Sequence, residues 1–259
     1  MLKVSCLLLA LFLHAPMRHL PPSARHTLFP ATMRLIPPST GREVVKKMYD
    51  RYTGKWYHSF TFNQTTEFYQ NDSLRRTQTW WEAIRFPDRF RIDFGEADSG
   101  NAVIFRGDSA YNFRNGKLRS SRINKDDLTF LLGGLYFYTF DSACKKLTRL
   151  HYDLSRAHED TWQGKPVYVV GAGKGDEKVN QLWIDQKNLY LVRMLTYEDN
   201  RKEEALFDGH QPFAGGWSET KCRFYFNDKL VQVETYHDCV PNQPLEDRLF
   251  DPIVFIKRK

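Results

Sequence analysis

The chain has 259 residues, of which 41% are hydrophobic and 15% aromatic, so it can bury a sizeable core. Its net charge of +7 is unevenly placed: residues 1–40 hold four of the 38 basic residues and no acid, which leaves 34 basic and 31 acidic residues beyond them. A body so nearly balanced in charge gives weak support for nucleic-acid binding, which usually needs a clustered basic face, and we expect no nucleic-acid partner.

Residues 1–15 have the pattern of a secretory signal peptide. Lys3 supplies the positive charge, Val4 to Leu13 form the apolar core, and the small residue Ala15 ends a possible cleavage site. The apolar run is too short to cross a bilayer, and the residues before Cys6 do not suit lipid attachment. We therefore expect an exported, soluble protein without a lipid anchor; an uncleaved, buried N-terminal segment is the alternative.

Residues 16–40 hold six prolines and show no period, so we interpret them as a flexible leader. Met33 could also begin a chain, and such a start would remove the signal peptide. No repeat or linker divides residues 41–259, which we interpret as one domain. Its cysteines are odd in number and fit no zinc-site spacing, so they predict neither a disulfide framework nor a metal site. They are Cys144, Cys222 and Cys239.

The domain is expected to begin with a short amphipathic helix. Thr40 and Glu43 form a capping box, and the apolar residues that follow recur on one helical face. From Trp56 to Asn63 apolar and polar residues then alternate at every step, the period of a half-buried strand.

Turn signals then predict a series of antiparallel strands. Gln70–Ser73 pairs Tyr69 with Leu74 and Phe62 with Trp81, and Pro87-Asp88 pairs Trp81 with Phe94 and Ala83 with Ile92. Gly107-Asp108 pairs Ile104 with Tyr111, and Asn115-Gly116, a strong hairpin signal, pairs Phe113 with Leu118.

These registers predict one continuous apolar face across six strands. Arg89, Arg91 and Asp93 are expected on the opposite, solvated face. The predicted apolar face consists of Phe60, Phe62, Trp81, Phe90, Ile92, Phe94, Ile104, Tyr111 and Phe113.

An apolar break around Gly133-Gly134 interrupts the strands. It is followed by a second short helix, which Asp141-Ser142 can cap. The break suits a movable lid over an apolar groove. The alternative is that its apolar residues fill a closed core. The predicted lid residues are Phe130, Leu131, Leu135, Tyr136 and Phe137.

Strands resume near Thr161 and continue to a last hairpin, Trp217 to Thr235, which places Cys222 opposite Val233 and out of disulfide reach of Cys239. The fold class is mainly β, with about ten to twelve strands in one antiparallel sheet that must curl into a closed barrel or a half-barrel. The short apolar segments are candidate covers for its mouth.

No catalytic or cofactor signature emerges from the sequence. Val169 to Asp176 resembles a nucleotide-binding loop, but the third glycine position is Asp176 and a strand follows instead of a helix, so a hairpin turn is the better interpretation. His58 is interpreted as a cavity-wall histidine. Trp80-Trp81 beside several arginines could suit nucleic acid, yet their alternation favours a solvated strand exterior. We expect no catalytic residue, metal ligand or cofactor.

Several segments resemble the outer-membrane lipoprotein-sorting protein family in its Bacteroidetes form, within the superfamily of the carrier LolA and the receptor LolB. The resemblance covers about residues 41–252. It is carried by Glu43–Tyr49, Lys55–Tyr57, Thr77–Ala83, Arg91–Phe94, His158–Gly171, Leu182–Asp185 and Leu249–Pro252.

The resemblance implies an unclosed antiparallel half-barrel with short helices over its mouth. It also implies a periplasmic, non-enzymatic carrier that receives acyl chains of lipoproteins or lipids and moves them toward the outer membrane. Its partners would be an inner-membrane release complex and an outer-membrane acceptor, and we expect a monomer. The alternatives are an envelope module that binds glycolipid or senses stress without transport, and an envelope hydrolase whose residues converge only in the fold.

Overall fold

The computed structural model describes residues 38–124 and 128–257, so the predicted signal peptide and most of the predicted leader lie outside the described residues. Helix α1 (Gly41–Tyr52) starts at the predicted capping box, in which the Thr40 hydroxyl accepts from the Glu43 amide. Val44, Val45 and Met48 form its buried face. The other helical segments are α2 (Leu128–Leu131), η1 (Gly134–Phe137), α3 (Phe140–Arg149) and η2 (Asp247–Phe250).

Thirteen strands of the described residues form one antiparallel sheet whose ends are β6 and β7, so the sheet is not closed. The order is β6-β5-β4-β3-β2-β1-β15-β14-β11-β10-β9-β8-β7, and β12 pairs with β13 separately. The bounds are β1 (Ser59–Gln70), β2 (Ser73–Arg85), β3 (Arg89–Phe94), β4 (Ala102–Arg106), β5 (Ser109–Arg114), β6 (Lys117–Ile123), β7 (Ala157–Trp162), β8 (Lys165–Val170), β9 (Gln181–Asp185), β10 (Leu191–Glu198), β11 (Arg201–Asp208), β12 (Gln211–Phe213), β13 (Gly216–Ser218), β14 (Lys221–Phe226) and β15 (Lys229–Pro241).

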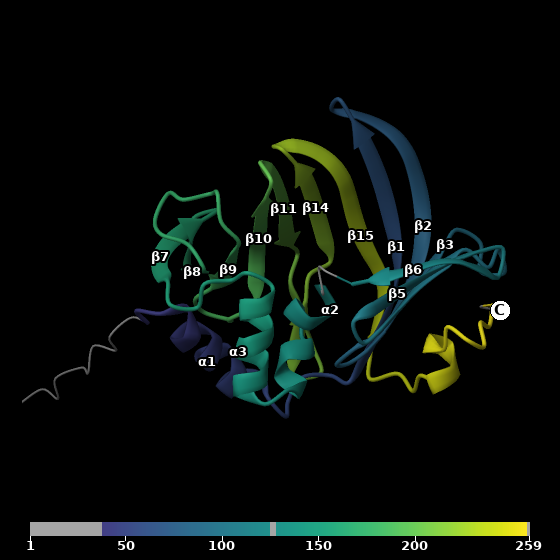
Figure 1. Ribbon diagram of the computed structural model, residues 1–259, viewed down its shortest axis with the longest axis horizontal. Helices are drawn as coiled ribbons and strands as arrows, with labels where there is room; N and C mark the ends of the chain where they lie inside the picture. Colours follow the sequence, from purple (N-terminus) through teal and green to yellow (C-terminus); the bar gives the residue numbers. More distant parts are fainter. Residues whose placement is uncertain (1–37, 125–127, 258–259) are drawn as a thin grey trace, which may run out of the picture. The chain divides into compact units, whose positions relative to one another are not determined.

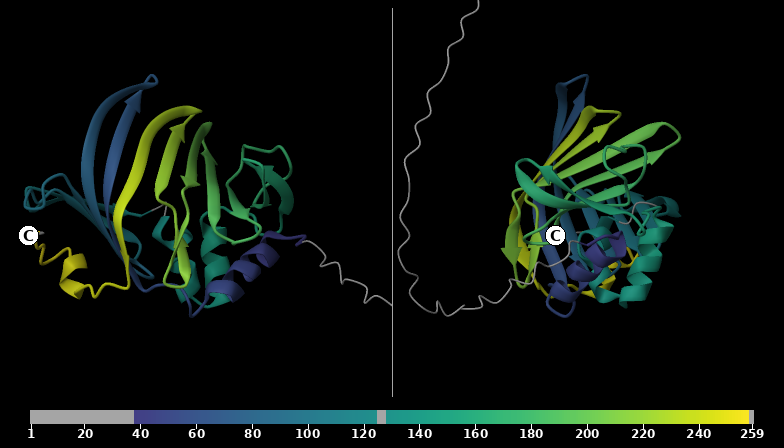
Figure 2. Two further views of the ribbon diagram at one scale, coloured as in Figure 1. Left: turned by 180° about the vertical axis from the view of Figure 1, so that it is seen from behind. Right: turned by 90° about the vertical axis from the view of Figure 1, so that its left-hand side faces the viewer.

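The sheet curves, and the helices α1, α2 and α3 lie together on one side of it (Figures 1 and 2). Their apolar side chains share the main core with one face of β1 and of β8 to β11. We call this face concave and the other convex. The fold class predicted from the sequence, a curved and unclosed antiparallel sheet with short helices, is therefore confirmed.

The predicted register of the first three strands was wrong by one residue. Tyr69 pairs with Leu74 as expected, but a β-bulge at Arg75 follows, so Phe62 lies opposite Glu82 and Trp81 lies opposite Asn63. The next turn leaves three residues unpaired, because Arg85 pairs with Arg89. Since neighbouring residues of a strand face opposite sides, each slip inverts every side chain beyond it.

The predicted apolar face therefore divides between the two sides of the sheet. Phe60, Phe62, Phe90, Ile92 and Phe94 share the concave face. Trp81, Ile104, Tyr111 and Phe113 lie on the convex face, where Phe250 and other residues of the C-terminal segment cover them. The pairs Ile104–Tyr111 and Phe113–Leu118 were predicted correctly. The error lay in the pairing of β1, β2 and β3, which placed Ile104, Tyr111 and Phe113 on the same face as Phe62.

The convex face also holds a charged pair that was expected to be solvated. Arg91 is fully buried, and its Nε donates to Asp93 Oδ2 at 2.7 Å. It donates as well to the main-chain carbonyls of Leu249 and Ile256. The C-terminal segment thus lies over this buried pair and is hydrogen-bonded to it.

The last hairpin of the sheet is also shifted by one residue. A bulge next to Phe224 places Cys222 opposite Glu234 instead of Val233. Cys144, Cys222 and Cys239 are all free thiols. No helix of the described residues combines the length and apolar character that spanning a membrane requires.

The buried pair gives a stability prediction. Replacing Asp93 by Ala leaves the Arg91 guanidinium buried without its counter-charge, so we expect the free energy of unfolding to fall by about 3–5 kcal/mol. Urea denaturation at neutral pH measures this. Asp98→Ala, which removes an exposed carboxylate nearby, should change stability by less than about 0.5 kcal/mol. Equal stability of the two variants would contradict the role assigned to the pair.

Candidate functional site

A cavity of about 110 Å³ lies on the concave face, between strands β1, β2, β3, β14 and β15 and the cover formed by α2 and the residues after β13. Side chains on its sheet wall are only half-buried at Trp80, Ile84, Phe90 and Ile92. The sheet wall therefore presents apolar surface that the rest of the described chain does not fully cover. The apolar residues that line the cavity are Tyr57, Phe60, Phe62, Trp80, Ile84, Phe86, Phe90, Ile92, Leu128, Leu132, Phe224 and Tyr236.

Four of the nine predicted groove residues line this cavity, namely Phe60, Phe62, Phe90 and Ile92. Phe94 shares their face and packs against Trp80, with ring centroids 4.9 Å apart. Sequence reasoning missed Trp80, Glu82 and Ile84, which alternate on β2 and therefore belong to one face. Their spacing was visible in the sequence, but the choice between Trp80 and Trp81 depended on a register that the bulge shifts.

The predicted lid residues belong mostly to the core. Phe130, Leu131, Leu135 and Tyr136 are all buried in the main hydrophobic cluster, and Phe137 stacks on Phe86 at 5.5 Å. The residues of the same segment that line the cavity are Leu128, Thr129 and Leu132. One side of this segment is thus packed in the main core, and its other side covers the cavity.

Two glycines next to this cover pack closely against neighbouring residues. Gly133 adopts φ +150°, and a Cβ there would lie 2.3 Å from Nε1 of Trp56. Gly134 is equally confined, because its Cβ would lie 2.8 Å from the carbonyl oxygen of Pro87. The two glycines allow the backbone to approach its neighbours closely, so packing explains them without a hinge.

Three glutamates enter the cavity from separate elements. Glu82 lies on β2, Glu234 on β15, and Glu219 directly after β13. Their exposed fractions are 5%, 7% and 6%, respectively. We call these three residues the acidic cluster. No lysine, arginine or histidine is among the described residues that line the cavity.

Burial dominates the electrostatics of the acidic cluster. It raises the pKa of Glu219 to about 7 and that of Glu234 to about 7. The pKa of Glu82 is raised well above its usual range, first by burial and then by the charges of the other two carboxylates. Near neutral pH the cluster therefore holds protons that exposed glutamates would have lost.

Hydrogen bonds connect this cluster to polar neighbours. Gln232 Nε2 donates to Glu234 Oε1 at 2.6 Å, and the Tyr236 hydroxyl donates to Glu234 Oε2 at 3.3 Å. The same hydroxyl lies 3.2 Å from the Cys222 thiol. Burial raises the pKa of this thiol well above its ordinary value, so Cys222 is a poor nucleophile at neutral pH.

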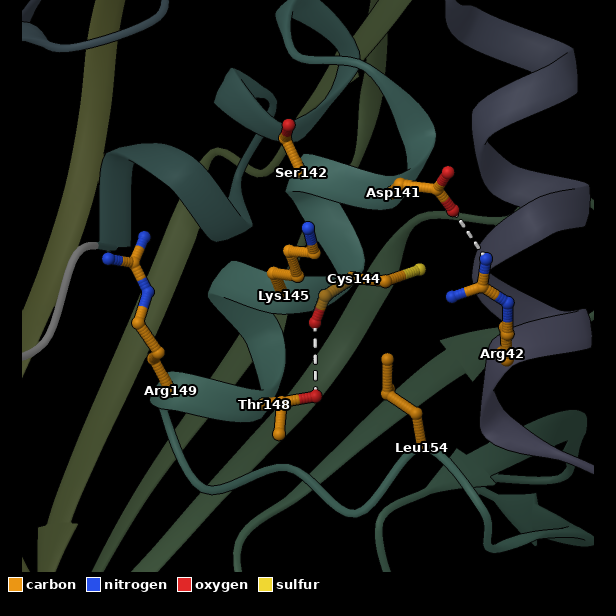
Figure 3. A pocket seen from close by; sticks show the side chains of 8 residues that line it. All are labelled: Arg42, Asp141, Ser142, Cys144, Lys145, Thr148, Arg149 and Leu154. Carbon is orange, nitrogen blue, oxygen red and sulfur yellow. Dashed lines mark hydrogen bonds and ion pairs between the residues drawn. The ribbon is translucent and has the colours of Figure 1, made fainter.

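Two other features of the described residues lie apart from this cavity. His58 precedes β1 and is exposed, so its interpretation as a cavity-wall residue was wrong. A surface hollow beside α1 and α3 is lined by Arg42, Asp141 and Cys144, among others (Figure 3). There Arg42 pairs with Asp141 at 2.6 Å, and burial raises the pKa of Cys144. Within residues 38–124 and 128–257, no three or more histidines, cysteines, aspartates or glutamates are placed closely enough to hold a metal ion.

The fold is similar to those of solved structures with different sequences. A putative outer membrane lipoprotein-sorting protein domain from Vibrio parahaemolyticus gives a TM-score of 0.60 at 12% identity, over 83% of this chain and 97% of that one. A DUF1329 family protein from Desulfovibrio piger gives 0.58 at 15% identity, over 82% and 95%. A LolA superfamily protein from Nitrosomonas europaea gives 0.55 at 14% identity, over 83% and 98%.

No family model and no curated protein matches the sequence. The expected resemblance to lipoprotein-sorting proteins is therefore confirmed in the fold, and at these identities the fold alone is shown.

The acidic cluster predicts an unusual dependence of stability on pH. The unfolded chain loses the Glu219 proton near its ordinary pKa of 4.5, whereas the native state keeps it to about 7. The native state then binds more protons than the unfolded state, so its stability falls as pH rises between these values. Glu219→Gln or Glu234→Gln should each reduce this fall by about 2–3 kcal/mol.

Urea denaturation at pH 4.5, 6 and 7.5 measures the effect. Glu203→Gln, which removes an exposed carboxylate on β11, is the matched control and should leave the pH profile of the parent protein unchanged. If the profiles of the three variants coincide, the carboxylates are not desolvated as described.

Proposed function

We propose that the protein is a carrier which binds acyl chains of lipoproteins or lipids on its concave face. The observation that supports this most is the half-buried aromatic surface of β2 and β3, which includes Trp80, Phe90 and Phe94 and continues the wall of the cavity. Apolar side chains left without cover on a concave surface are characteristic of ligand-binding grooves. The similarity to a lipoprotein-sorting domain and to a LolA superfamily protein supports the same class of function.

The energetics suit an alkyl chain without directional chemistry. Each buried methylene contributes about 0.8 kcal/mol, so one long acyl chain offers about 10 kcal/mol before the entropic costs of binding. The cavity of about 110 Å³ is smaller than the roughly 300 Å³ at which ligand pockets begin. A chain must therefore extend along the half-buried surface of β2 and β3 or displace the cover.

The cover that would move is the segment of Leu128, Thr129 and Leu132. These residues contact the cavity, whereas their neighbours Phe130 and Leu131 hold the segment in the core. In the bound state an acyl chain would take the place of the cover's side chains. Competition between the two would let the carrier release its cargo.

Export and transport belong to the same proposal. We infer that the protein acts in the periplasm as a soluble monomer without a lipid anchor. It would receive cargo from an inner-membrane release complex and deliver it to an outer-membrane acceptor. The signal-like pattern of residues 1–15 supports export. Binding of a glycolipid, or sensing without transport, would use the same groove and would differ only in the cargo.

A hydrolase is the second candidate, because the cavity contains carboxyl groups with raised pKa values, as general acids require. Acid–base catalysis by carboxyl pairs also needs a partner that stays ionised. Here burial raises the pKa of all three glutamates, including Glu82, which favours binding over hydrolysis. Turnover of a lipid ester that is lost in Glu82→Gln would support the hydrolase instead.

A fluorescent fatty acid tests the groove and its register together. It should bind the purified protein and quench Trp80, which lies on the concave face, but not Trp81, which lies on the convex face. Trp80→Ala should weaken binding by about 1–3 kcal/mol through lost apolar contact. Trp81→Ala should leave the affinity close to that of the parent.

Conservative variants separate quenching from affinity. Trp80→Phe should abolish most of the energy transfer to the probe and keep most of the affinity, whereas Trp81→Phe should keep both. Saturable binding that neither Trp80 variant alters would place the ligand elsewhere. Absence of any saturable binding would remove the carrier proposal.

A further inference from the structure

Two segments on the convex side of the sheet expose apolar side chains to solvent. Strand β6, at one end of the sheet, leaves Ile123 72% exposed and Leu118 more than half exposed. The C-terminal segment leaves Ile253 90% exposed and Val254 more than half exposed. These four side chains are half of the eight large apolar side chains that are exposed among the described residues.

The exposed residues of the two segments lie close together. Leu118 pairs with Phe113, and Ile123 pairs with Ser109. Opposed residues share a face, and Phe113 and Ser109 are four residues apart on β5, so both exposed residues of β6 are on the convex face with Phe113. The C-terminal segment reaches the same place, because the ring of Phe255 stacks on Phe113 with centroids 4.3 Å apart (Figure 1).

Hydrogen bonds hold the backbone of the C-terminal segment while its two exposed side chains point outward. The amides of Ile253 and Val254 both donate to Asp251 Oδ1, at 2.8 and 3.4 Å. Further along the segment, the carbonyl of Ile256 accepts from the buried Arg91 at 2.8 Å. The exposed residues thus lie between two bonded points, and their exposure belongs to the folded segment instead of a frayed end.

The same two segments carry the excess positive charge of the domain. Residues 109–123 and 252–257 contain five basic residues and no acidic one, whereas the rest of residues 41–257 contains 27 basic and 31 acidic residues. We call these two segments the edge surface. Its five basic residues are all exposed, and they are Arg114, Lys117, Arg119, Arg122 and Lys257.

We propose that the edge surface binds the surface of an anionic phospholipid bilayer. Interfacial binding combines aliphatic side chains, which insert at the boundary between head groups and acyl chains, with basic side chains that are attracted to the lipid phosphates. The long arginine side chains of β6 can reach head groups from either face of this strand. The inference goes beyond the proposed function, because it concerns a membrane contact on the other side of the sheet from the groove.

Other occupants match the edge surface less well. Basic residues on an end strand commonly prevent its pairing with another strand, and a second copy of this chain would bring like charges together. Such protection explains the charges but not the exposure of Ile123 and Ile253, since apolar side chains that are exposed close together mark an interaction site. A nucleic acid would leave these aliphatic side chains in water. An acidic protein is the remaining occupant, and vesicle binding distinguishes it from a bilayer.

Sedimentation of the full chain with lipid vesicles tests the proposal. The protein should bind vesicles of equal parts phosphatidylcholine and phosphatidylglycerol about tenfold more tightly than vesicles of phosphatidylcholine alone, because only the former attract the basic residues. Added salt should weaken this binding, since it screens charges at an exposed surface.

A double substitution tests the aliphatic residues. Ile253→Ser combined with Val254→Ser should weaken binding to the anionic vesicles about tenfold, because less apolar surface is inserted. Leu74→Ser combined with Val231→Ser removes two exposed apolar side chains elsewhere and should leave vesicle binding unchanged. Both double variants should keep the urea midpoint and the fatty-acid affinity of the parent protein, because all four side chains are exposed and lie outside the groove.

A second double substitution tests the charges. Arg119→Gln combined with Arg122→Gln should weaken binding to the anionic vesicles by at least fivefold, since each basic residue near an anionic surface strengthens binding by about fivefold. Arg201→Gln combined with Lys229→Gln, which removes two exposed basic residues of β11 and β15, is the matched control and should bind as the parent does.

Two outcomes would overturn the inference and leave the carrier proposal standing. Absence of binding to the anionic vesicles would leave an acidic protein as the occupant of the edge surface. Vesicle binding that neither the aliphatic nor the arginine double variant alters would place the membrane contact elsewhere in the chain. Loss of fatty-acid binding in the parent protein would instead overturn the carrier proposal and leave the membrane contact standing.

Discussion

Whether a side chain faces the groove depends on whether the bulges and turns before it add an odd or an even number of residues. One extra residue at Arg75 and a three-residue turn between Arg85 and Arg89 set the faces of β2 and β3. One face of each strand lines the groove and the other lies beneath the C-terminal segment, so β2 carries apolar residues on both faces. A slip by one residue would exchange Trp80 for Trp81 and Ile92 for Arg91, and would expel a buried charge into the groove.

The convex face limits how the sheet can bend. There Arg91 joins β3 to the carbonyls of Leu249 and Ile256, and Asp93 neutralises it within the same strand. Near this pair, Arg85, Arg89 and Arg106 surround the carboxylate of Asp247. The C-terminal segment therefore holds β2, β3 and β4 together from behind. This support adds rigidity to the sheet, because the concave face of β2 and β3 is incompletely packed.

Much of the fold could be predicted from the sequence, since turns such as Asn115-Gly116 fix local pairs and the capping box fixes the start of α1. The face on which each side chain of β2 and β3 lies could not be predicted. The bulge at Arg75 lies in a run of polar residues, where no change in the apolar pattern marks it. Trp80 and Trp81 are adjacent and equally apolar, so the sequence does not indicate which of them faces the groove. The acidic cluster was also hidden, as Glu82, Glu219 and Glu234 lie far apart in the chain and meet only through strand order.

The groove combines two demands that oppose each other. Apolar walls favour an alkyl chain, yet they also deprive Glu82 and its two neighbours of the water that would stabilise their charge. A protein that only held alkyl chains would gain stability by replacing these glutamates with apolar residues. Protonation lowers this cost, because burial raises the pKa of Glu219 and Glu234 to about 7 and that of Glu82 well above its usual range. The apolar walls that suit an alkyl chain thus also set the protonation state of the glutamates, because the neutral carboxyl group is the form that tolerates burial.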